Sequence, residues 1–308
     1  MQPFGGAALR YPLDDPFTRR IGPGVHDGDV HQQDVPLPGG RTLRVHDVGG
    51  GDLAVLWQHG RPNIGVPPAP LYDVARRLGV RWVGHDRPGY GGSTPAPGRS
   101  VASVAADVAA VADALGVERF GVLGHSGGGP HALACAALLP ERVTAVVSFA
   151  GLAPRDATGL DWYAGMAAAD VASLRAAEAG REARLAHEET PAATGEEPVA
   201  ADRRALDGPW RWLETVTGPA AGAGVEGLVE DDLAFVAPWG FDPADVRAPV
   251  LLVHGSADPV VPSAHSRWLA ERCRSPRLQI LPGEGHVSVL ASAAAALAWV
   301  RERTFPES

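Results

Sequence analysis

The 308-residue sequence contains no lysine, so its 27 basic residues are all arginines. Acidic residues outnumber them at 36, and the net charge of −9 argues against nucleic acid or an anionic membrane as the main partner. The only cysteines are Cys135 and Cys273, far apart in the sequence, and a chain of this size does not need a disulfide scaffold. The absence of a Cys-x-x-Cys motif argues against the common zinc and redox motifs. The 11 histidines lack the spacing of metal ligands, so we expect neither a metal site nor a cofactor.

Long apolar runs are absent as well. No segment is long enough to span a bilayer, and residues 1–30 lack the apolar core of a signal peptide. We therefore expect a cytoplasmic protein that acts on a small molecule without a membrane partner, while the oligomeric state stays open. A hydrophobic fraction of 45% is typical of globular proteins, and the length suits one α/β domain with an insertion.

Segments with the patterns of strands and helices alternate along the chain after an irregular arm at residues 1–30. Strands are predicted at residues 41–48, 53–58, 81–85, 120–123, 143–149, 250–253 and 278–281, and helices at 71–78, 101–115, 129–139, 263–272 and 291–301. This alternation predicts an α/β fold with a mostly parallel central sheet and helices on both faces. Residues 152–240 interrupt it with helical stretches at 164–188, 202–215 and 230–237. Such an insertion is expected above the carboxyl ends of the strands, where ligands bind in parallel sheets.

The most informative segment is residues 122–129, VLGHSGGG, in which a short apolar run ends at Ser126 between glycines. A turn this tight forces its central residue into a strained backbone conformation, which only small neighbours tolerate. It would present the Ser126 hydroxyl beside a helix N-terminus, which favours negative charge. In a chain with 38 glycines, an ordinary turn or a phosphate cradle would also match, although no Gly-Lys-Ser/Thr follows.

A serine hydroxyl needs an oriented base nearby before it can act as a nucleophile. Asp258 follows the predicted strand at 250–253, and His286 follows the next one at 278–281. Taken alone, Asp258 would cap a helix or turn, and His286 would be a polar residue at a helix start. Together with Ser126, they follow strands in the order nucleophile, acid, histidine. This combination predicts a catalytic triad.

The set of motifs resembles that of the α/β-hydrolase superfamily, in its serine hydrolase branch with a helical cap. The resemblance begins at about Val30 and includes residues 59–60, HG, after the strand predicted at 53–58, and residues 86–93, DRPGYGGS, after the strand predicted at 81–85. It implies three parts, namely an N-terminal arm at 1–30, a core at 31–151 and 241–308, and a helical cap at 152–240 inserted after the sixth strand.

The same resemblance implies a role for each matching residue. Ser126 would attack a carbonyl carbon, His286 would take the hydroxyl proton, and Asp258 would orient the imidazole. The oxyanion hole would consist of the backbone N–H groups of Gly127 and Arg61. Losing one such donor typically lowers the rate by about 10²–10³.

Several side chains near these motifs have two interpretations. The Arg61 guanidinium would either lean over the site and favour an anionic or carbonyl-rich substrate, or point into solvent. His125 would pack internally or line the substrate pocket, and His59 is expected to be structural. Asp156 lies near an alternative acid position used by some relatives, whereas Asp86 is expected to anchor its own glycine-rich turn.

Large aromatic and apolar residues gather in the predicted insertion, although the chain is only 6% aromatic. Some of them are expected to line an apolar substrate pocket above Ser126, while any single one would alternatively hold the cap to the sheet. The set comprises Trp162, Tyr163, Met166, Trp210, Trp212 and Trp239.

The resemblance implies a cofactor-free serine hydrolase that cleaves a carboxylic ester or lactone of a small apolar substrate through an acyl-enzyme. Perhydrolases (cofactor-free haloperoxidases), carbon–carbon bond hydrolases, thioesterases, iminopeptidases and hydroxynitrile lyases share the triad and are alternatives. Haloalkane dehalogenases and epoxide hydrolases of this fold usually carry aspartate in place of Ser126, which argues against both. A non-catalytic ligand receptor on this fold would often lack a triad member, and all three candidates are present here.

Overall fold

The central feature of the fold is one eight-stranded sheet with the strand order β1-β2-β4-β3-β5-β6-β7-β8. The computed structural model describes residues 30–190 and 197–306, so the arm predicted at 1–30 lies almost entirely outside the described residues. The β1–β2 and β2–β4 pairs are antiparallel and the other adjacent pairs are parallel, which confirms the predicted α/β fold class. The strands are β1 (His31–Pro36), β2 (Thr42–Gly49), β3 (Leu53–Gln58), β4 (Val80–His85), β5 (Phe120–His125), β6 (Val143–Phe149), β7 (Val250–Gly255) and β8 (Pro276–Leu281).

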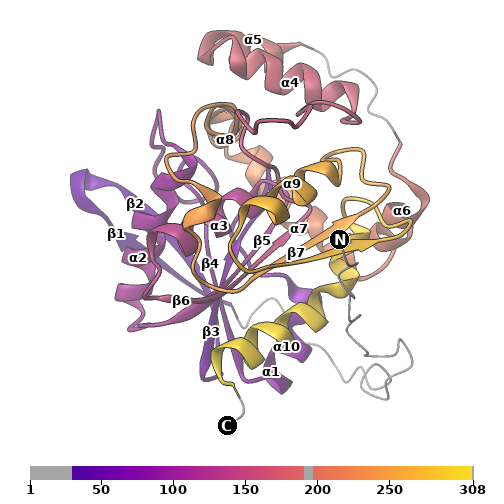
Figure 1. Cartoon of the computed structure of the whole chain (residues 1–308). Helices are drawn as coiled ribbons and strands as arrows, with labels where there is room; N and C mark the ends of the chain where they lie inside the picture. Colours follow the sequence, from indigo (N-terminus) through magenta and orange to yellow (C-terminus); the bar gives the residue numbers. More distant parts are fainter. Residues whose placement is uncertain (1–29, 191–196, 307–308) are drawn as a thin grey trace.

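Helices cover both faces of this sheet (Figure 1). One buried apolar cluster packs α2, α3 and α9 against one face, and a second cluster packs α1 and α10 against the other. Successive residues of β5, Val122 and Leu123, belong to different clusters, as expected for a strand covered on both sides. These helices are α1 (Tyr72–Arg77), α2 (Val104–Ala114), α3 (Gly128–Leu138), α9 (Ala264–Arg272) and α10 (Ala293–Thr304).

The predicted strands agree best with the structure at the centre of the sheet. β3 and β6 have the predicted bounds, and every residue of both strands is buried, which explains their continuous apolar sequences. The sequence does not predict β1. Val35 is the only buried residue of this edge strand, so its sequence has no apolar alternation that would identify it.

Five α-helices lie between β6 and β7 in the part of the chain that the structure describes, in a segment that we call the insertion (residues 150–249). The single helix predicted at 164–188 is instead two helices, because Gly180 between them has a φ of 110°, which ends the first one. The helix predicted at 202–215 is also divided, at Pro209, because proline cannot donate a hydrogen bond within a helix. The five are α4 (Ala168–Glu178), α5 (Arg181–Glu189), α6 (Ala200–Leu206), α7 (Leu213–Gly222) and α8 (Glu226–Val236).

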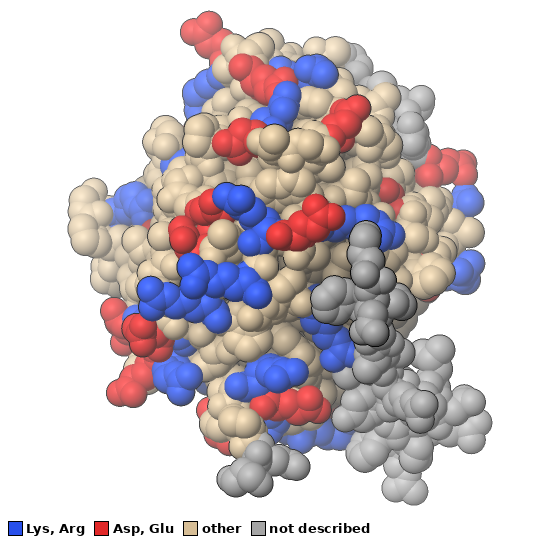
Figure 2. All heavy atoms as spheres, in the orientation of Figure 1, with Lys and Arg blue, Asp and Glu red and all other residues tan. Residues whose placement is uncertain are grey.

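The surface carries charges of both signs. On the face shown in Figure 2, acidic and basic side chains are interspersed rather than gathered by sign. Exposed ion pairs, such as Arg272–Asp242 and Arg301–Asp52, join opposite charges at the surface. Among residues 30–190 and 197–306, no helix combines the length and the apolar character that crossing a membrane requires.

Candidate active site

Ser126 lies in the turn between β5 and α3. Its φ of 55° is a conformation that residues other than glycine rarely adopt, which confirms the strained turn predicted from the sequence. The flanking glycines permit this turn, since a Cβ atom on Gly124 would lie 2.2 Å from the carbonyl oxygen of Gly128, and one on Gly128 would lie 1.9 Å from that of Gln58. Ser126 is partly exposed, whereas the residues on both sides of it are buried.

Asp258 and His286 form a buried pair after the ends of β7 and β8. Nδ1 of His286 lies 2.8 Å from Oδ2 of Asp258, so the protonated Nδ1 donates to the carboxylate. The other oxygen of Asp258 accepts the backbone N–H groups of Val260 and Val261 at 2.9 and 3.0 Å, which fixes the carboxylate within its turn. With Nδ1 protonated, the neutral imidazole keeps Nε2 as its proton acceptor.

The charges around this pair favour its ionised form. Burial alone would lower the pKa of His286, yet the carboxylates of Asp258, Asp202 and Asp170 raise this pKa above its ordinary value. Burial alone would raise the pKa of Asp258, but the charge of His286 and a hydrogen bond from His254 bring it well below its ordinary value. Asp258 is therefore an anion at neutral pH, as the orienting acid of a triad must be.

His125, the residue before Ser126, connects the serine turn to the histidine loop. Its Nε2–H donates to the backbone carbonyl oxygen of His286 at 2.8 Å, and the centres of the two rings are 5.0 Å apart. Burial, together with the nearby His286, lowers the pKa of His125 to about 3, so the ring is neutral. These contacts support internal packing for His125, and a contact with substrate stays a prediction.

The loop after β3, residues 59–61, lies against the serine turn. A Cβ atom on Gly60 would be 3.4 Å from the Cβ atom of Ser126. Within the described residues, the backbone N–H groups of Gly127 and Arg61 have no hydrogen-bond acceptor. An oxyanion hole requires unpaired donors of this kind beside the nucleophile, and the one expected at Gly127 and Arg61 stays a prediction.

Arg87, after β4, holds this loop from inside the protein. Its guanidinium donates to the carbonyl oxygens of His59 and Gly60, and its backbone N–H donates to Nε2 of His59 at 3.1 Å. The Arg87 side chain is 1% exposed and lies 2.6 Å from the fully buried carboxylate of Asp231 in α8. His59 is therefore structural, as expected. Sequence reasoning missed the role of Arg87, because its partner is 144 residues away along the chain.

The Arg61 side chain corrects one expectation. Its guanidinium lies 2.9 Å from Asp232 of α8 and 3.4 Å from Asp170 of α4, and the side chain is only 16% exposed. An orientation into solvent is therefore wrong, because the guanidinium lies between these two carboxylates. Arg61 shares Asp232 with Arg184, which lies 2.7 Å from it, and also faces Asp170, so its guanidinium is occupied by groups of the protein. Arg61 thus links the loop after β3 to the insertion.

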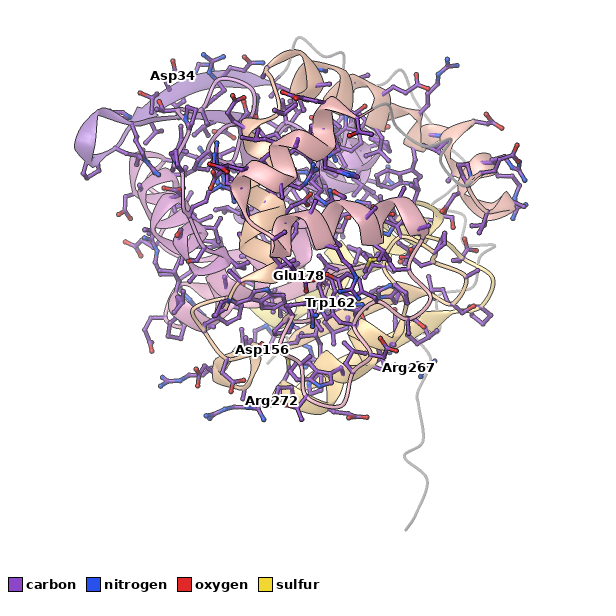
Figure 3. The ribbon with its side chains drawn as sticks, turned by 90° about the horizontal axis from the view of Figure 1, so that it is seen from above. Asp34, Asp156, Trp162, Glu178, Arg267 and Arg272 are labelled. Atoms are coloured by element: carbon purple, nitrogen blue, oxygen red, sulfur yellow. The ribbon has the colours of Figure 1, made fainter. Side chains whose placement is uncertain are left out.

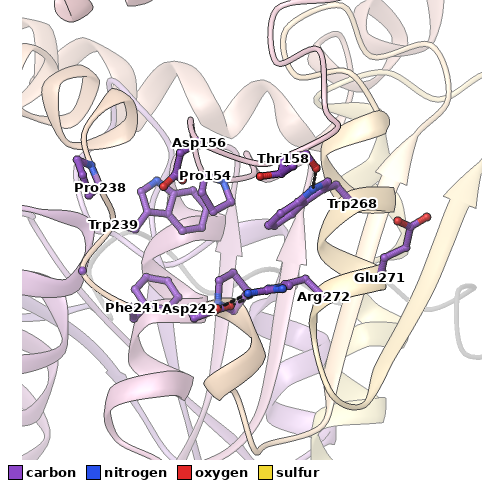
Figure 4. Close-up of a pocket in the computed structure, with 12 residues that line it drawn as sticks. Pro154, Asp156, Thr158, Pro238, Trp239, Phe241, Asp242, Trp268, Glu271 and Arg272 are labelled. Atoms are coloured by element: carbon purple, nitrogen blue, oxygen red, sulfur yellow. Dashed lines mark hydrogen bonds and ion pairs between the residues drawn. The ribbon is translucent and has the colours of Figure 1, made fainter.

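Asp156 lies in a different region from the Asp258–His286 pair. It lines a pocket of about 550 Å³ whose walls include Trp239 and Trp268 (Figure 4). None of the three predicted triad residues contributes to the lining of this pocket. Asp258, and not Asp156, is thus the carboxylate bonded to the candidate histidine.

Asp86 anchors its own glycine-rich turn, as the sequence predicts. Its Oδ2 accepts the backbone N–H of Gly92 at 2.9 Å, and its Oδ1 accepts that of Gly65 at 2.7 Å. Nε2 of the buried His46 also lies 2.8 Å from Oδ1. These bonds fix the start of the turn from which Arg87 extends.

The aromatic residues of the insertion are largely occupied by packing. Trp162 donates its indole N–H to the Ala153 carbonyl at 2.8 Å, and the Arg155 guanidinium lies over the rings of Trp162 and Tyr163. Glu178 of α4, which is labelled together with Trp162 in Figure 3, forms an ion pair with the same Arg155. These contacts support a role in holding the insertion to the core, and a substrate pocket built from these residues stays a prediction. The other members of the predicted set are buried within the two apolar clusters, namely Met166, Trp210, Trp212 and Trp239.

Comparison with known protein families gives one match that spans most of the chain. A family model described as the alpha/beta hydrolase fold matches residues 54–293. A curated protein, the pimeloyl-[acyl-carrier protein] methyl ester esterase of Aromatoleum aromaticum, is 38% identical over 79 residues. That match spans only 26% of this chain and 29% of the esterase.

Solved structures of the same architecture cover nearly the whole chain. A bromoperoxidase from Bacillus anthracis has a TM-score of 0.65 at 20% identity, with 88% of this chain and 97% of that one covered. An enol-lactonase from Burkholderia xenovorans has a TM-score of 0.62 at 20% identity, covering 86% of this chain and 97% of that chain. An alpha/beta hydrolase fold protein from Nakamurella multipartita has a TM-score of 0.61 at 25% identity over 89% of this chain and 99% of that one. At these identities the likeness concerns the fold.

Proposed function

The chain belongs to the alpha/beta hydrolase fold family, and we propose that it is a serine hydrolase that cleaves a carboxylic ester or lactone of a small apolar substrate through an acyl-enzyme on Ser126. The observation that carries the proposal is the oriented Asp258–His286 pair, which His125 joins to the serine turn. The curated esterase that matches over 79 residues supports ester chemistry over the other reactions of this fold. The proposal includes a cofactor-free reaction in the cytoplasm and a cap at residues 152–240 above the substrate.

In the first half of the proposed reaction, the Ser126 hydroxyl oxygen attacks the carbonyl carbon of the substrate while His286 Nε2 takes the hydroxyl proton. The negative charge on the carbonyl oxygen is stabilised by the backbone N–H groups of Gly127 and Arg61. Asp258 stabilises the imidazolium through Nδ1. When the tetrahedral intermediate collapses, the bond to the leaving alkoxide breaks, and the alkoxide takes the proton from His286.

In the second half, a water molecule attacks the carbonyl carbon of the acyl-enzyme. His286 Nε2 takes a proton from this water, and the same two N–H groups stabilise the second tetrahedral intermediate. Breaking the bond to the Ser126 oxygen releases the carboxylic acid, and the serine oxygen recovers its proton from His286. The proposal thus needs no group beyond the side chains and backbone donors described above.

The rate of ester hydrolysis should depend on pH through His286. The imidazole acts as a base only when neutral, and nearby carboxylates outweigh burial and raise its pKa above the ordinary value of 6.5. We therefore expect kcat/KM for a short p-nitrophenyl ester to fall as the pH drops through this raised pKa. A pH profile from about pH 5 to pH 9 brackets this range. A flat profile, or a rate that rises on acidification, would contradict the assignment of His286 as the base.

A further inference from the structure

Asp202 belongs to α6 of the insertion, but its carboxylate lies against the loop that carries His286. It is 4% exposed. Its Oδ2 accepts the backbone N–H of His286 at 2.9 Å, and its Oδ1 accepts those of Val287 and Ser288 at 3.0 and 2.8 Å. One side chain from the insertion thus satisfies three successive N–H groups of the histidine loop.

These N–H groups lead into the short 3-10 helix η8 (Ser288–Ser292). The first N–H groups of a helix have no acceptor within it, and leaving a buried one unpaired is unfavourable. Since His286 and Ser288 are both buried, an acceptor from elsewhere in the protein is needed. An ionised carboxylate forms stronger bonds in this role than a neutral acceptor would.

The packing of α6 against the histidine loop leaves no room for a side chain at position 285. A Cβ atom on Gly285 would lie 2.4 Å from Oδ2 of Asp202 and 2.5 Å from a side-chain carbon of Val199. Glycine is thus required directly before the histidine so that the helix can approach. The Gly285 N–H in turn donates to the hydroxyl of Ser288 at 2.8 Å, which closes the loop on itself.

Three side chains hold His286, each at a different group. Asp258 accepts from the ring nitrogen, His125 donates to the backbone carbonyl, and Asp202 accepts from the backbone N–H. Asp258 follows β7 and His125 is the last residue of β5, so both belong to the core, whereas Asp202 belongs to the insertion. The position of the histidine therefore depends on both parts of the protein.

We propose that Asp202 is a positioning residue for His286, and that docking of the insertion onto the core completes the geometry of the catalytic histidine. Asp202 contacts the backbone of the histidine loop and acts through His286. Displacing a catalytic group by about 1 Å can lower a rate by about 10²-fold, so this support matters for the reaction. The catalytic part of the inference rests on the proposed function, while the effect on the loop is independent of it.

Four groups from different elements surround the His286 imidazole. They are Asp258 after β7, Asp202 in α6, Asp170 in α4 and the neutral His125 at the end of β5. Burial lowers the pKa of His286, and the three carboxylates raise it by stabilising the imidazolium. Removing the charge of Asp202 should therefore lower the pKa of His286, because one of these carboxylates is lost.

Replacement of Asp202 by asparagine should lower kcat/KM for a p-nitrophenyl ester by about 10-fold, and replacement by alanine by about 10²-fold. We expect the loss to be mainly in kcat, because Asp202 positions the base. The acid limb of the pH profile should also move to lower pH in both variants, which a purely structural role would not produce. The matched control is Asp207→Asn, at the exposed end of the same helix, which should leave rate and profile unchanged.

Two further measurements do not require activity. In Asp202→Ala, hydrogen–deuterium exchange should become faster in a peptide that contains residues 286–288, while peptides from β3 and β6 exchange as in the wild type. An NMR titration of the His286 ring should show a lower pKa in Asp202→Asn. If Asp202→Ala does not fold, the same exchange measurement on Asp202→Asn tests the positioning role. The amide nitrogen of asparagine cannot accept a hydrogen bond, so at least one of the N–H groups of residues 286–288 loses its acceptor.

These results separate the two proposals. If the wild type has no esterase activity, the proposed function is overturned. The positioning role of Asp202 still holds in that case if its variants show faster exchange at residues 286–288 and a lower pKa of His286. Unchanged exchange at residues 286–288, or faster exchange spread over the whole sheet, would overturn the positioning role. So would an unshifted pKa of His286, even if the wild type is an active esterase.

Discussion

Replacing Ser126 with alanine should lower kcat/KM for short p-nitrophenyl esters by at least about 10⁴-fold, leaving only the contribution of binding and of the oxyanion donors. The reason is that alanine has no oxygen to attack the carbonyl, so the base that His286 provides has no hydroxyl proton to take. Initial rates measured across a series of ester chain lengths would show this loss. Activity above a tenth of the wild-type value would contradict the role of Ser126.

Two further variants make this result interpretable. Ser126→Gly also removes the hydroxyl, but glycine adopts the φ of 55° without steric strain, so this variant should be at least as stable as the wild type. A stable and inactive Ser126→Gly protein would show that the activity is lost through the hydroxyl and not through unfolding. Ser263→Ala, at the start of α9, is a matched serine control and should retain full activity.

Replacing Asp258 with asparagine should lower kcat by about 10³–10⁴-fold with little change in the fold. The amide can donate to Nδ1 of His286, which favours the tautomer with the proton on Nε2, so the imidazole no longer accepts the serine proton. Because Asp258 also raises the pKa of His286, the acid limb of the remaining activity should move to lower pH.

The control for this variant is Asp156→Asn, which alters the carboxylate near the alternative acid position of the fold. Asp156 lines the pocket beside Trp239 and Trp268 and should have no effect on the rate. A large loss in Asp156→Asn together with a small loss in Asp258→Asn would reverse the assignment. The hydrogen bond of 2.8 Å between Asp258 and His286 predicts the opposite order.

Much of the fold could be predicted from the sequence because the central strands are buried on both faces. β3 and β6 are mostly apolar runs with clear ends, and the glycines around Ser126 mark a turn that only they permit. The edge strand β1 could not be predicted, because a strand exposed on most of its length carries no apolar pattern. Helix breaks in the insertion depended on single residues, such as Gly180, whose conformation an apolar pattern does not reveal.

In the candidate site, too, some features could be predicted from the sequence and others could not. Ser126, Asp258 and His286 each follow a strand, and the pairing of Asp258 with His286 could be predicted from the order of strand ends in a parallel sheet. The partners of Arg61 and Asp202 could not, because ion pairs and hydrogen bonds between the insertion and the core connect residues far apart in sequence. Local motifs therefore predict the triad, and tertiary packing determines what holds its proposed members in place.

The most direct test of the account is to locate the residue that a fluorophosphonate modifies. We expect rapid addition of one phosphonyl group per chain, on the peptide that contains Ser126, with loss of ester hydrolysis in proportion to labelling. The modification should be absent in Ser126→Ala and slow in Asp258→Asn. No modification of the wild type, or modification of a different residue, would contradict a serine nucleophile, and recovery of a bound ligand unchanged would indicate a receptor instead.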